Sequence, residues 1–446
     1  MTAAAQCIYP EVIWPLLLSL SLRKVAPSHG RQPAEPPLSV HGVRGLGLHR
    51  AVRGGGAGPG VSRGGVPAEP QTPLGRGGEE PQEAGGCRGL GGGEAVPARA
   101  QHGCGHHYLR CGGSLLPGSH VQAEQVVRAC VENGAHFVDI SGEPQYLETM
   151  CLKYDQQAAE NGVYIVGSTG FDSIPADLGV IFTRDSLKGT LTAVESILTF
   201  KSGPLGTCIH NGTWQSAIHG IADQGNLKKL RKQLAYKPLP VVGRKLKRRS
   251  ALSYSGEVEQ YTIPFLGADA SVVKRSQRYL HEYLQETPVQ YSAYAAVGGL
   301  FSAVKLIFAG LLFAIFTKFC CGRNLLIKFP RFFSFGYFSS EGPTQQQMDQ
   351  CSFEMTFFGE GYSPGKDPQQ GAPDLKICTR VSGPEAAYVT TPIAMVQAAV
   401  AIQTEPGSLP KNGGVFGPAA AFSKTKIIER MDKRGLRFLV VSRTEA

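Results

Sequence analysis

The N-terminal part of the chain lacks most of the residues from which a folded core is built. Between residues 26 and 107 there is no Ile, Phe, Trp or Met, and no Lys, Asn or Asp. This stretch cannot bury enough apolar surface to offset the entropy of an ordered chain. We therefore predict that residues 1–123 form an atypical Gly/Pro/Arg-rich segment that is disordered. The residues present there have GC-rich codons, so a translated upstream exon is an alternative to a genuine tail.

The cysteines argue against two further classes of protein. There are 11 of them, an odd number, and their spacing is irregular. This pattern excludes the disulfide framework of a small secreted domain and favours a reducing compartment. Cys104, His106, His107 and Cys111 superficially resemble a metal cluster, but they lie in a low-complexity run without a paired motif. We therefore predict no metal site.

Positive charge exceeds negative charge, and the formal net charge is +10. Much of the excess lies between Lys228 and Arg249, where no acidic residue occurs. This stretch fits either a solvated basic face or attraction to anionic lipid headgroups. We find no nucleic-acid recognition motif in it, so we predict no nucleic-acid partner.

From Glu124 onward the sequence alternates between helical periodicity and short apolar strands. The strands are expected at residues 136–140 and 163–167, with helices before, between and after them. Helices that alternate with buried strands indicate a parallel, doubly wound sheet of the α/β class. We assign this region to residues 124–188.

Two polar turns follow these strands, at the edge where ligands bind to sheets of this kind. The first turn runs from Asp139 to Glu143, and the second from Thr169 to Ser173. Because right-handed crossovers bring such turns to one edge, we expect Glu143 and Asp172 to lie close together. Both are catalytic candidates. Free backbone N–H groups near Ser173 would suit an anion, although ordinary helix capping explains Asp172 and Ser173 equally well.

After residue 188 the pattern changes to alternating strands, which predicts a mixed α+β domain over residues 189–446. We expect an antiparallel sheet whose strands include residues 190–201, a hairpin of 352–358 with 375–381, and a closing strand at 436–441. His210 is a third catalytic candidate because histidine titrates near neutral pH, although a surface or packed histidine is the commoner case.

An apolar segment at residues 293–319 interrupts this second domain. Only Lys305 breaks the run, and basic residues follow it. Its length would allow it to span a bilayer, but a charge near its middle is costly there. Strands before and after the segment are also expected to share one sheet. We therefore predict that it enters one leaflet of a membrane or lipid droplet from the cytosolic face, a buried core helix being the alternative.

Several motifs resemble those of the saccharopine dehydrogenase-like family of oxidoreductases. The resemblance is carried by Val138-Asp-Ile-Ser-Gly-Glu-Pro144 and above all by Gly170-Phe-Asp-Ser-Ile-Pro-Ala-Asp-Leu-Gly179. It continues through Gly212-Thr-Trp-Gln-Ser-Ala217 and Thr391-Pro-Ile-Ala-Met-Val396. The resemblance implies a Rossmann-type domain, of which residues 124–188 would be the C-terminal remnant, and NADP or NAD as cofactor. It also implies that the cofactor contacts residues of the two turns, namely Ser141, Gly142, Gly170, Phe171 and Ser173.

One part of the family pattern is not found in this sequence. The family begins with a strand and a glycine-rich turn of the form G-A-S-G-F-T-G, whereas the glycine-rich run Gly54–Gly60 follows no strand and opens no helix. Without that turn the helix N-terminus that holds the diphosphate is missing, and the remaining strands are expected to have open edges. We therefore predict that the chain binds NADP(H) weakly or not at all.

Two functions remain open after this reading, so the sequence leaves it undecided whether the chain is an enzyme. One is an NAD(P)-dependent oxidoreductase that acts on a small, lipid-like substrate at a membrane or lipid-droplet surface. The other is a non-catalytic protein of such a surface. The expected location is a lipid droplet or the mitochondrion, and the sequence does not indicate an oligomeric state.

Overall fold

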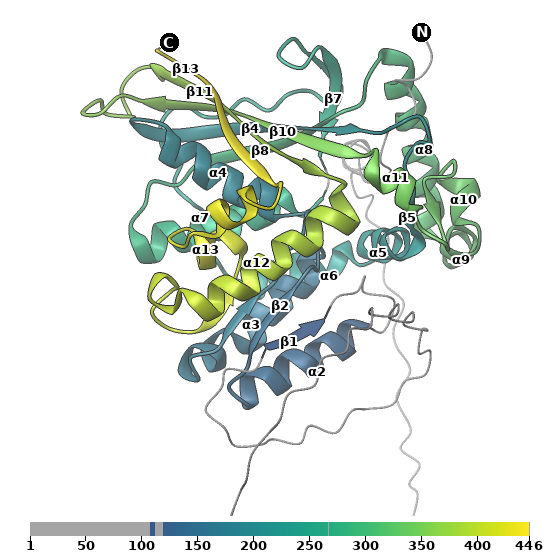
Figure 1. Ribbon diagram of the computed structural model, residues 1–446, viewed down its shortest axis with the longest axis horizontal. Helices are drawn as coiled ribbons and strands as arrows, with labels where there is room; N and C mark the ends of the chain where they lie inside the picture. The colour runs from purple at the N-terminus through teal and green to yellow at the C-terminus, as the bar shows by residue number, and fades with distance from the viewer. Residues whose placement is uncertain (1–107, 112–118, 266, 446) are drawn as a thin grey trace, which may run out of the picture. The chain divides into compact units, whose positions relative to one another are not determined.

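The computed structural model describes residues 108–111, 119–265 and 267–445 (Figure 1). Most of the segment predicted to be disordered, including Cys104, His106 and His107, lies outside the described residues.

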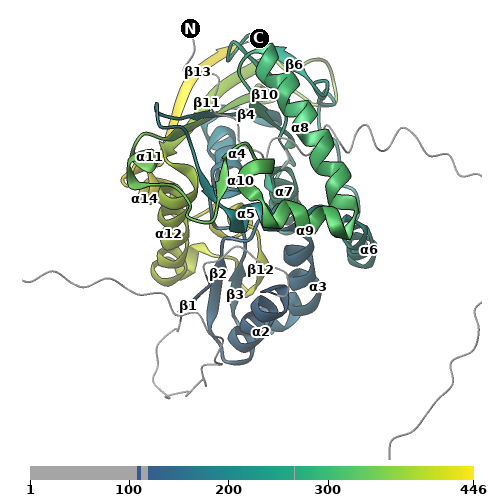
Figure 2. The same cartoon turned by 90° about the vertical axis from the view of Figure 1, so that its right-hand side faces the viewer.

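A parallel sheet of four strands carries the two predicted turns. Its order is β1 (Tyr108–Cys111), β2 (His136–Asp139), β3 (Tyr164–Val166) and β12 (Gly414–Phe416), and all neighbouring pairs are parallel. Helices α2 (Ser119–Glu132) and α3 (Pro144–Glu160) lie on one side of this sheet, and α12 (Thr391–Thr404) lies on the other (Figure 2). The predicted doubly wound α/β arrangement is thus confirmed.

Two features of this sheet differ from the sequence-based expectation. Regular structure does not begin at Glu124, because β1 and the first residues of α2 precede it. The edge beside β3 is not open either, because β12 returns from the C-terminal part of the chain and pairs with it. Gly413 allows this approach, since a Cβ there would lie 2.4 Å from backbone atoms of Ala158 and Val163.

A second, larger sheet has seven strands. Their order is β13 (Arg437–Glu445), β11 (Leu375–Pro384), β10 (Ser352–Tyr362), β4 (Thr190–Lys201), β8 (Gln290–Ala296), β7 (Gln260–Pro264) and β6 (Ser253–Ser255). The predicted hairpin of β10 and β11 is present, as is the closing strand. The expectation of a purely antiparallel sheet was wrong, because β4 and β8 are parallel. A long crossover that contains several helices joins these two strands, as parallel pairing requires.

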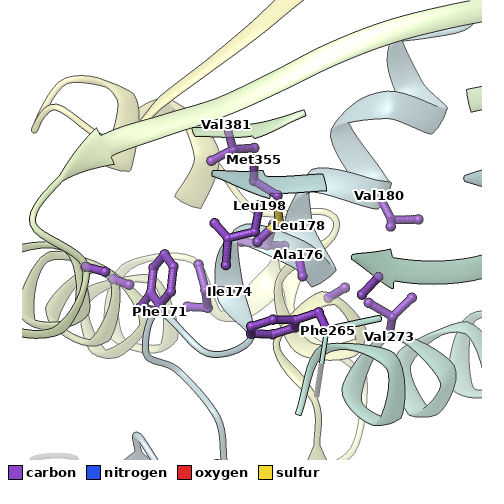
Figure 3. Close-up of a cluster of buried hydrophobic side chains, with 14 of the residues drawn as sticks. Phe171, Ile174, Ala176, Leu178, Val180, Leu198, Phe265, Val273, Met355 and Val381 are labelled. Carbon is purple, nitrogen blue, oxygen red and sulfur yellow. The ribbon is translucent and has the colours of Figure 1, made fainter. Parts of the chain in front are cut away.

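Helices between the two sheets form the main core. Helix α4 (Ile174–Ser186) packs on the large sheet and against α7 (Asp269–Leu284) and α13 (Pro418–Phe422). Figure 3 shows side chains of α4, among them Ile174 and Leu178, in a cluster with Val273 of α7 and with Leu198, Met355 and Val381 of the large sheet. Gly179 lets α4 approach β10, because a Cβ there would lie 2.2 Å from the Phe357 ring. The short α14 (Ile427–Asp432) precedes the closing strand β13.

The remaining elements flank the sheets. They are β5 (Ile209–His210), α5 (Asn211–Ala222), α6 (Gln224–Leu234), α8 (Leu300–Lys318), α9 (Cys320–Lys328), α10 (Pro330–Phe333), β9 (Phe338–Ser339), α11 (Gln345–Asp349), the π-helix η2 (Ala386–Thr390) and the 3-10 helix η3 (Pro406–Ser408). The apolar segment is shorter than predicted, because its first residues belong to β8 and the helix begins only at Leu300. Helix α8 is continuous through Gly310.

Candidate functional site

A cavity of about 500 Å³ opens at the carboxyl ends of β2 and β3. Residues 140–145 and 170–172 form one wall, and helix α5 forms another through Gly212, Thr213, Ser216, Ala217 and Gly220. The π-helix η2 and the first residue of α12 complete the lining with Ala386, Ala387, Tyr388 and Thr391. Parallel α/β sheets bind their ligands at this edge.

Asp139, the last residue of β2, holds the two turns together. Its Oδ1 accepts hydrogen bonds from the Ser141 hydroxyl at 2.7 Å, the Ser141 N–H at 3.1 Å and the Ser168 N–H at 3.2 Å. Burial raises the pKa of Asp139, while the bonds from Ser141 and Ser168 act in the opposite direction. Asp139 is buried and does not line the cavity. Its role is therefore to fix the positions of the turns that do.

Glu143 and Asp172 face each other in this cavity, as the sequence predicted. A Cβ on Gly142 would lie 3.2 Å from Asp172 Oδ2, so the two turns are in close contact. Removal from water raises the pKa of both carboxyl groups, and the charge of Glu143 helps to raise that of Asp172 to about 6. In such a pair the ionisation of one carboxyl group makes the ionisation of the other less favourable.

The Glu143 side chain is not used to cap its own helix. It makes no cap hydrogen bond at the start of α3, and instead accepts from the Gly142 N–H at 3.1 Å. The Ser216 hydroxyl of α5 donates to the same carboxylate and lowers its pKa. Ser216 thus holds Glu143 from the opposite wall of the cavity. The sequence analysis noted the stretch that contains Ser216 but did not predict this role.

His210 also lines the cavity, but its ring has a structural task. Its Nδ1 accepts from the Gly212 N–H at 3.2 Å and so caps α5. Its backbone N–H donates to the Tyr388 hydroxyl at 2.9 Å. Burial raises the pKa of Tyr388, and the bond from His210 opposes that effect. Tyr388 lies on the π-helix η2, whose first N–H groups bond to the Glu385 carboxylate. Nothing in the sequence pattern marked Tyr388 as a cavity residue.

Some of the residues that were predicted to contact a cofactor line the cavity, and one does not. Ser141, Gly142, Gly170 and Phe171 line the cavity, whereas Ser173 is fully buried and does not. The anion site expected at Ser173 is not formed as predicted, because the N–H groups of Ser173 and Ile174 both donate to the Gly170 carbonyl. No Lys or Arg occurs among the described residues that line the cavity. In the part of the chain that the structure describes, no group of three or more His, Cys, Asp and Glu side chains is placed to hold a metal ion.

Comparison with known proteins decides the family. The chain is 61% identical over 322 residues to a saccharopine dehydrogenase-like oxidoreductase of Rattus norvegicus, a match that covers 72% of this chain and 75% of that protein. The chain belongs to the saccharopine dehydrogenase-like family. It is also 36% identical over 326 residues to a protein of Caenorhabditis elegans named as lipid droplet localized, with 72% of this chain and 76% of that protein covered. No family model matches the chain.

A plant relative has a different named location. A saccharopine dehydrogenase-like oxidoreductase of Arabidopsis thaliana, named as mitochondrial, is 33% identical over 348 residues, which cover 72% of this chain and 76% of the relative. The motif Gly170–Gly179, which carries much of the resemblance, has a structural explanation. A Cβ on Gly170 would lie 3.1 Å from Thr391 Cγ2, and Gly179 admits the Phe357 ring. The motif therefore brings a cavity turn and a core helix into close contact with their neighbours.

Proposed function

We propose that this member of an oxidoreductase family binds a small, lipid-like substrate in the cavity while its body rests on a membrane or lipid-droplet surface. The observation that carries the proposal is the composition of the cavity. Its described lining has no Lys or Arg, and its carboxyl groups are the neighbouring pair Glu143 and Asp172, whose pKa values are raised by burial. A substrate rich in carboxylates, such as saccharopine, would be repelled there, whereas an uncharged carbonyl or hydroxyl compound would not.

The carboxyl pair supplies the chemistry that such a substrate needs. With a pKa of about 6, Asp172 exchanges a proton readily near neutral pH. In its protonated form the pair donates a hydrogen bond to a carbonyl oxygen, and in its ionised form it accepts one from a hydroxyl group. Glu143 stays in place through its bonds to Gly142 and Ser216. Tyr388, which also lines the cavity, adds a hydroxyl group to these two carboxyl groups.

The described residues fit a nicotinamide cofactor only in part. The carboxyl groups of Glu143 and Asp172 suit ribose hydroxyls, but the space beside Gly142 and Gly170 is taken up by Asp172, Ile140 and Thr391. No described lining residue, however, carries a positive charge for a diphosphate. NADP or NAD is therefore the cofactor that family membership suggests.

Helix α8 supports the lipid-surface part of the proposal. It is one of two described helices whose length and composition would allow them to cross a membrane. The other, residues 386–404, packs in the core through Ala394, Ala398 and Ala401. On α8 one face is buried, and the other is apolar and exposed. We call this exposed set the outer face of α8; it consists of Phe301, Val304, Phe308, Leu311, Leu312 and Ile315.

A helix with one face packed against the protein and the other face exposed suits insertion into a single leaflet better than it suits crossing the bilayer. Phe301 is 83% exposed and Phe308 61%, while Phe313 on the opposite face packs 4.6 Å from the Trp214 ring. Lys305 is exposed, and its Nζ lies 5.3 Å from the centre of the Phe335 ring. A lysine at that position can reach the headgroups of a leaflet that α8 enters lengthwise.

Helix α5 lies between the cavity and α8. The side of α5 that faces the cavity carries Ser216 and Ala217. Its other side carries Trp214, whose ring packs at a tilt against Phe313 of α8 and whose Nε1 donates to the Leu326 carbonyl of α9 at 2.9 Å. This arrangement supports delivery of the substrate from the lipid surface, because α5 contacts both the cavity and α8.

Cross-linking with a photoreactive lipid tests the proposal. Vesicles that contain a diazirine-labelled fatty alcohol are mixed with the full chain and irradiated, and the cross-linked residues are mapped by mass spectrometry. We expect adducts both on the outer face of α8 and in the cavity. Ala217→Trp should remove only the cavity adducts, because the new ring fills the space. Ala222→Trp, on an exposed position of the same helix, is the matched control and should change neither set. Adducts on α8 alone in the unchanged chain would contradict substrate binding.

The non-catalytic function is the second candidate. Two observations favour it: the glycine-rich turn of the family is not found in the sequence, and the described cavity lining has no cationic side chain. Consumption of NADPH in the presence of the lipid vesicles separates the two candidates. Cavity adducts with no consumption of cofactor would support a lipid-binding protein that has kept the fold without the reaction.

A further inference from the structure

Two adjacent cysteines differ in exposure from the others. Among the cysteines whose side chains the structure describes, Cys320 and Cys321 are the exposed ones. Cys130 and Cys351 are buried, and Cys151, Cys208 and Cys378 are partly buried. The two exposed thiols are therefore the ones that a reagent or an enzyme can reach directly.

Their position is the corner between α8 and α9. Helix α8 ends at Lys318, the chain turns at Phe319, and α9 begins at Cys320 (Figure 2). Gly322 allows the chain to turn this tightly, because a Cβ there would lie 2.2 Å from the Phe316 carbonyl oxygen. The Arg323 guanidinium also bonds back to the Thr317 carbonyl at 3.0 Å. The corner is thus fixed against α8, and the two thiols are presented at its outside.

The surroundings of these thiols combine apolar and basic groups. Phe319, directly before them, is 58% exposed and continues the apolar outer face of α8. Lys318 and Arg323 flank the pair on either side. An apolar surface next to basic side chains is typical of a segment that lies at a bilayer interface. Cysteines in such a position are typical sites of reversible acylation.

We propose that Cys320 and Cys321 are acceptors of long-chain fatty acyl groups in thioester linkage. The proposal rests on the lipid-surface function above and adds a covalent anchor to it. A Cys sulfur attacks the thioester carbonyl of a fatty acyl-coenzyme A, and a new S–C bond forms at the cysteine. The bond between that carbonyl and the sulfur of coenzyme A breaks, and coenzyme A leaves as its thiol with the proton released by the cysteine. No oxidant or reductant is consumed.

The acyl chains would extend into the leaflet that already receives the outer face of α8. One apolar signal by itself binds a membrane reversibly, whereas two signals together give stable anchoring. Helix α8 is the first signal, and the acylated corner is the second. The proposal therefore predicts tight and reversible attachment without a spanning segment.

Metabolic labelling tests this assignment. Cells that express the full chain are fed an alkyne-bearing fatty acid, and the purified protein is coupled to a fluorescent azide with and without neutral hydroxylamine. The variant C320S/C321S is compared with C151S/C208S, which changes two partly buried cysteines elsewhere. Binding to membranes is measured on the same samples by flotation, and thermal melting checks that both variants are folded.

The expected result is a hydroxylamine-sensitive label on the unchanged chain and on C151S/C208S, and its loss from C320S/C321S. C320S/C321S should still reach membranes through α8, but it should be washed off more easily. A label that persists in C320S/C321S overturns the assignment. An unchanged chain that carries no label but floats with membranes also overturns it, although the proposed function then stands. An unlabelled chain that does not float overturns both.

Discussion

Replacing Asp172 by Asn is expected to stabilise the protein at alkaline pH while impairing the site. Asp172 is partly enclosed beside Glu143, and both burial and that charge raise its pKa from 3.8 to about 6. A carboxyl group whose pKa is raised on folding stabilises the fold fully below its unfolded pKa. That contribution is lost as the pH rises through the folded pKa. Ionised Asp172 thus destabilises the native state at neutral and alkaline pH.

The size of this cost follows from the shift. About two pKa units correspond to roughly 3 kcal/mol, at about 1.4 kcal/mol per unit. Asp172 borders the cavity, so water screens part of the interaction, and we expect about 1 to 2 kcal/mol in practice. Asp172→Asn should therefore raise the free energy of unfolding by this amount near pH 8 and leave it almost unchanged near pH 4.

Urea unfolding, followed by tryptophan fluorescence, measures the difference at both pH values. Trp214 is buried against α8 and reports on the same body. The matched control is Asp185→Asn, an exposed carboxylate on the same helix α4, which should show no pH-dependent gain. An equal effect of Asp172→Asn at both pH values, or a loss of stability near pH 8, would refute the conclusion that ionised Asp172 destabilises the native state.

Three further outcomes are expected. Fluorescence titration of the chain with NADPH should show no saturation at micromolar cofactor, because the family's glycine-rich turn is not found in the sequence; saturable micromolar binding would contradict this. Phe308→Ala should weaken flotation with vesicles while leaving the melting temperature unchanged, whereas Phe313→Ala should destabilise the fold by about 3 to 5 kcal/mol, because only the second ring is buried. Gly179→Ala should lower the melting temperature strongly, because the new Cβ meets the Phe357 ring at 2.2 Å; an unchanged melting temperature would show that α4 can shift.

The sequence was most informative where local patterns and chain direction suffice. The turns after β2 and β3 could be placed because consecutive parallel strands end at one edge, and Glu143 and Asp172 meet there as expected. The apolar residues of α8 were also visible, although the strand residues of β8 before them could not be separated by hydropathy alone.

Long-range pairing was beyond such reasoning. Strand β12 has three residues, too few for any periodicity, and it pairs with a strand about 250 residues earlier in the chain. The parallel pairing of β4 with β8 depends on the path of the crossover, which alternation in the sequence does not encode. Tyr388 reaches the cavity only because η2 is a π-helix capped by Glu385, and no spacing rule predicts that geometry.

Protease protection in sealed microsomes tests the central claim, that α8 enters a lipid surface without crossing it. One epitope tag is placed in the exposed loop at Leu205, before α8, and another in the loop at Gly365, after it. Strands from both sides of α8 pair in one sheet, so both loops belong to one folded body. We predict that the chain floats with the membranes and that protease removes both tags together from the cytosolic side. Protection of one tag alone would mean that α8 spans the bilayer, and a chain that stays in the soluble fraction would contradict the lipid-surface function itself.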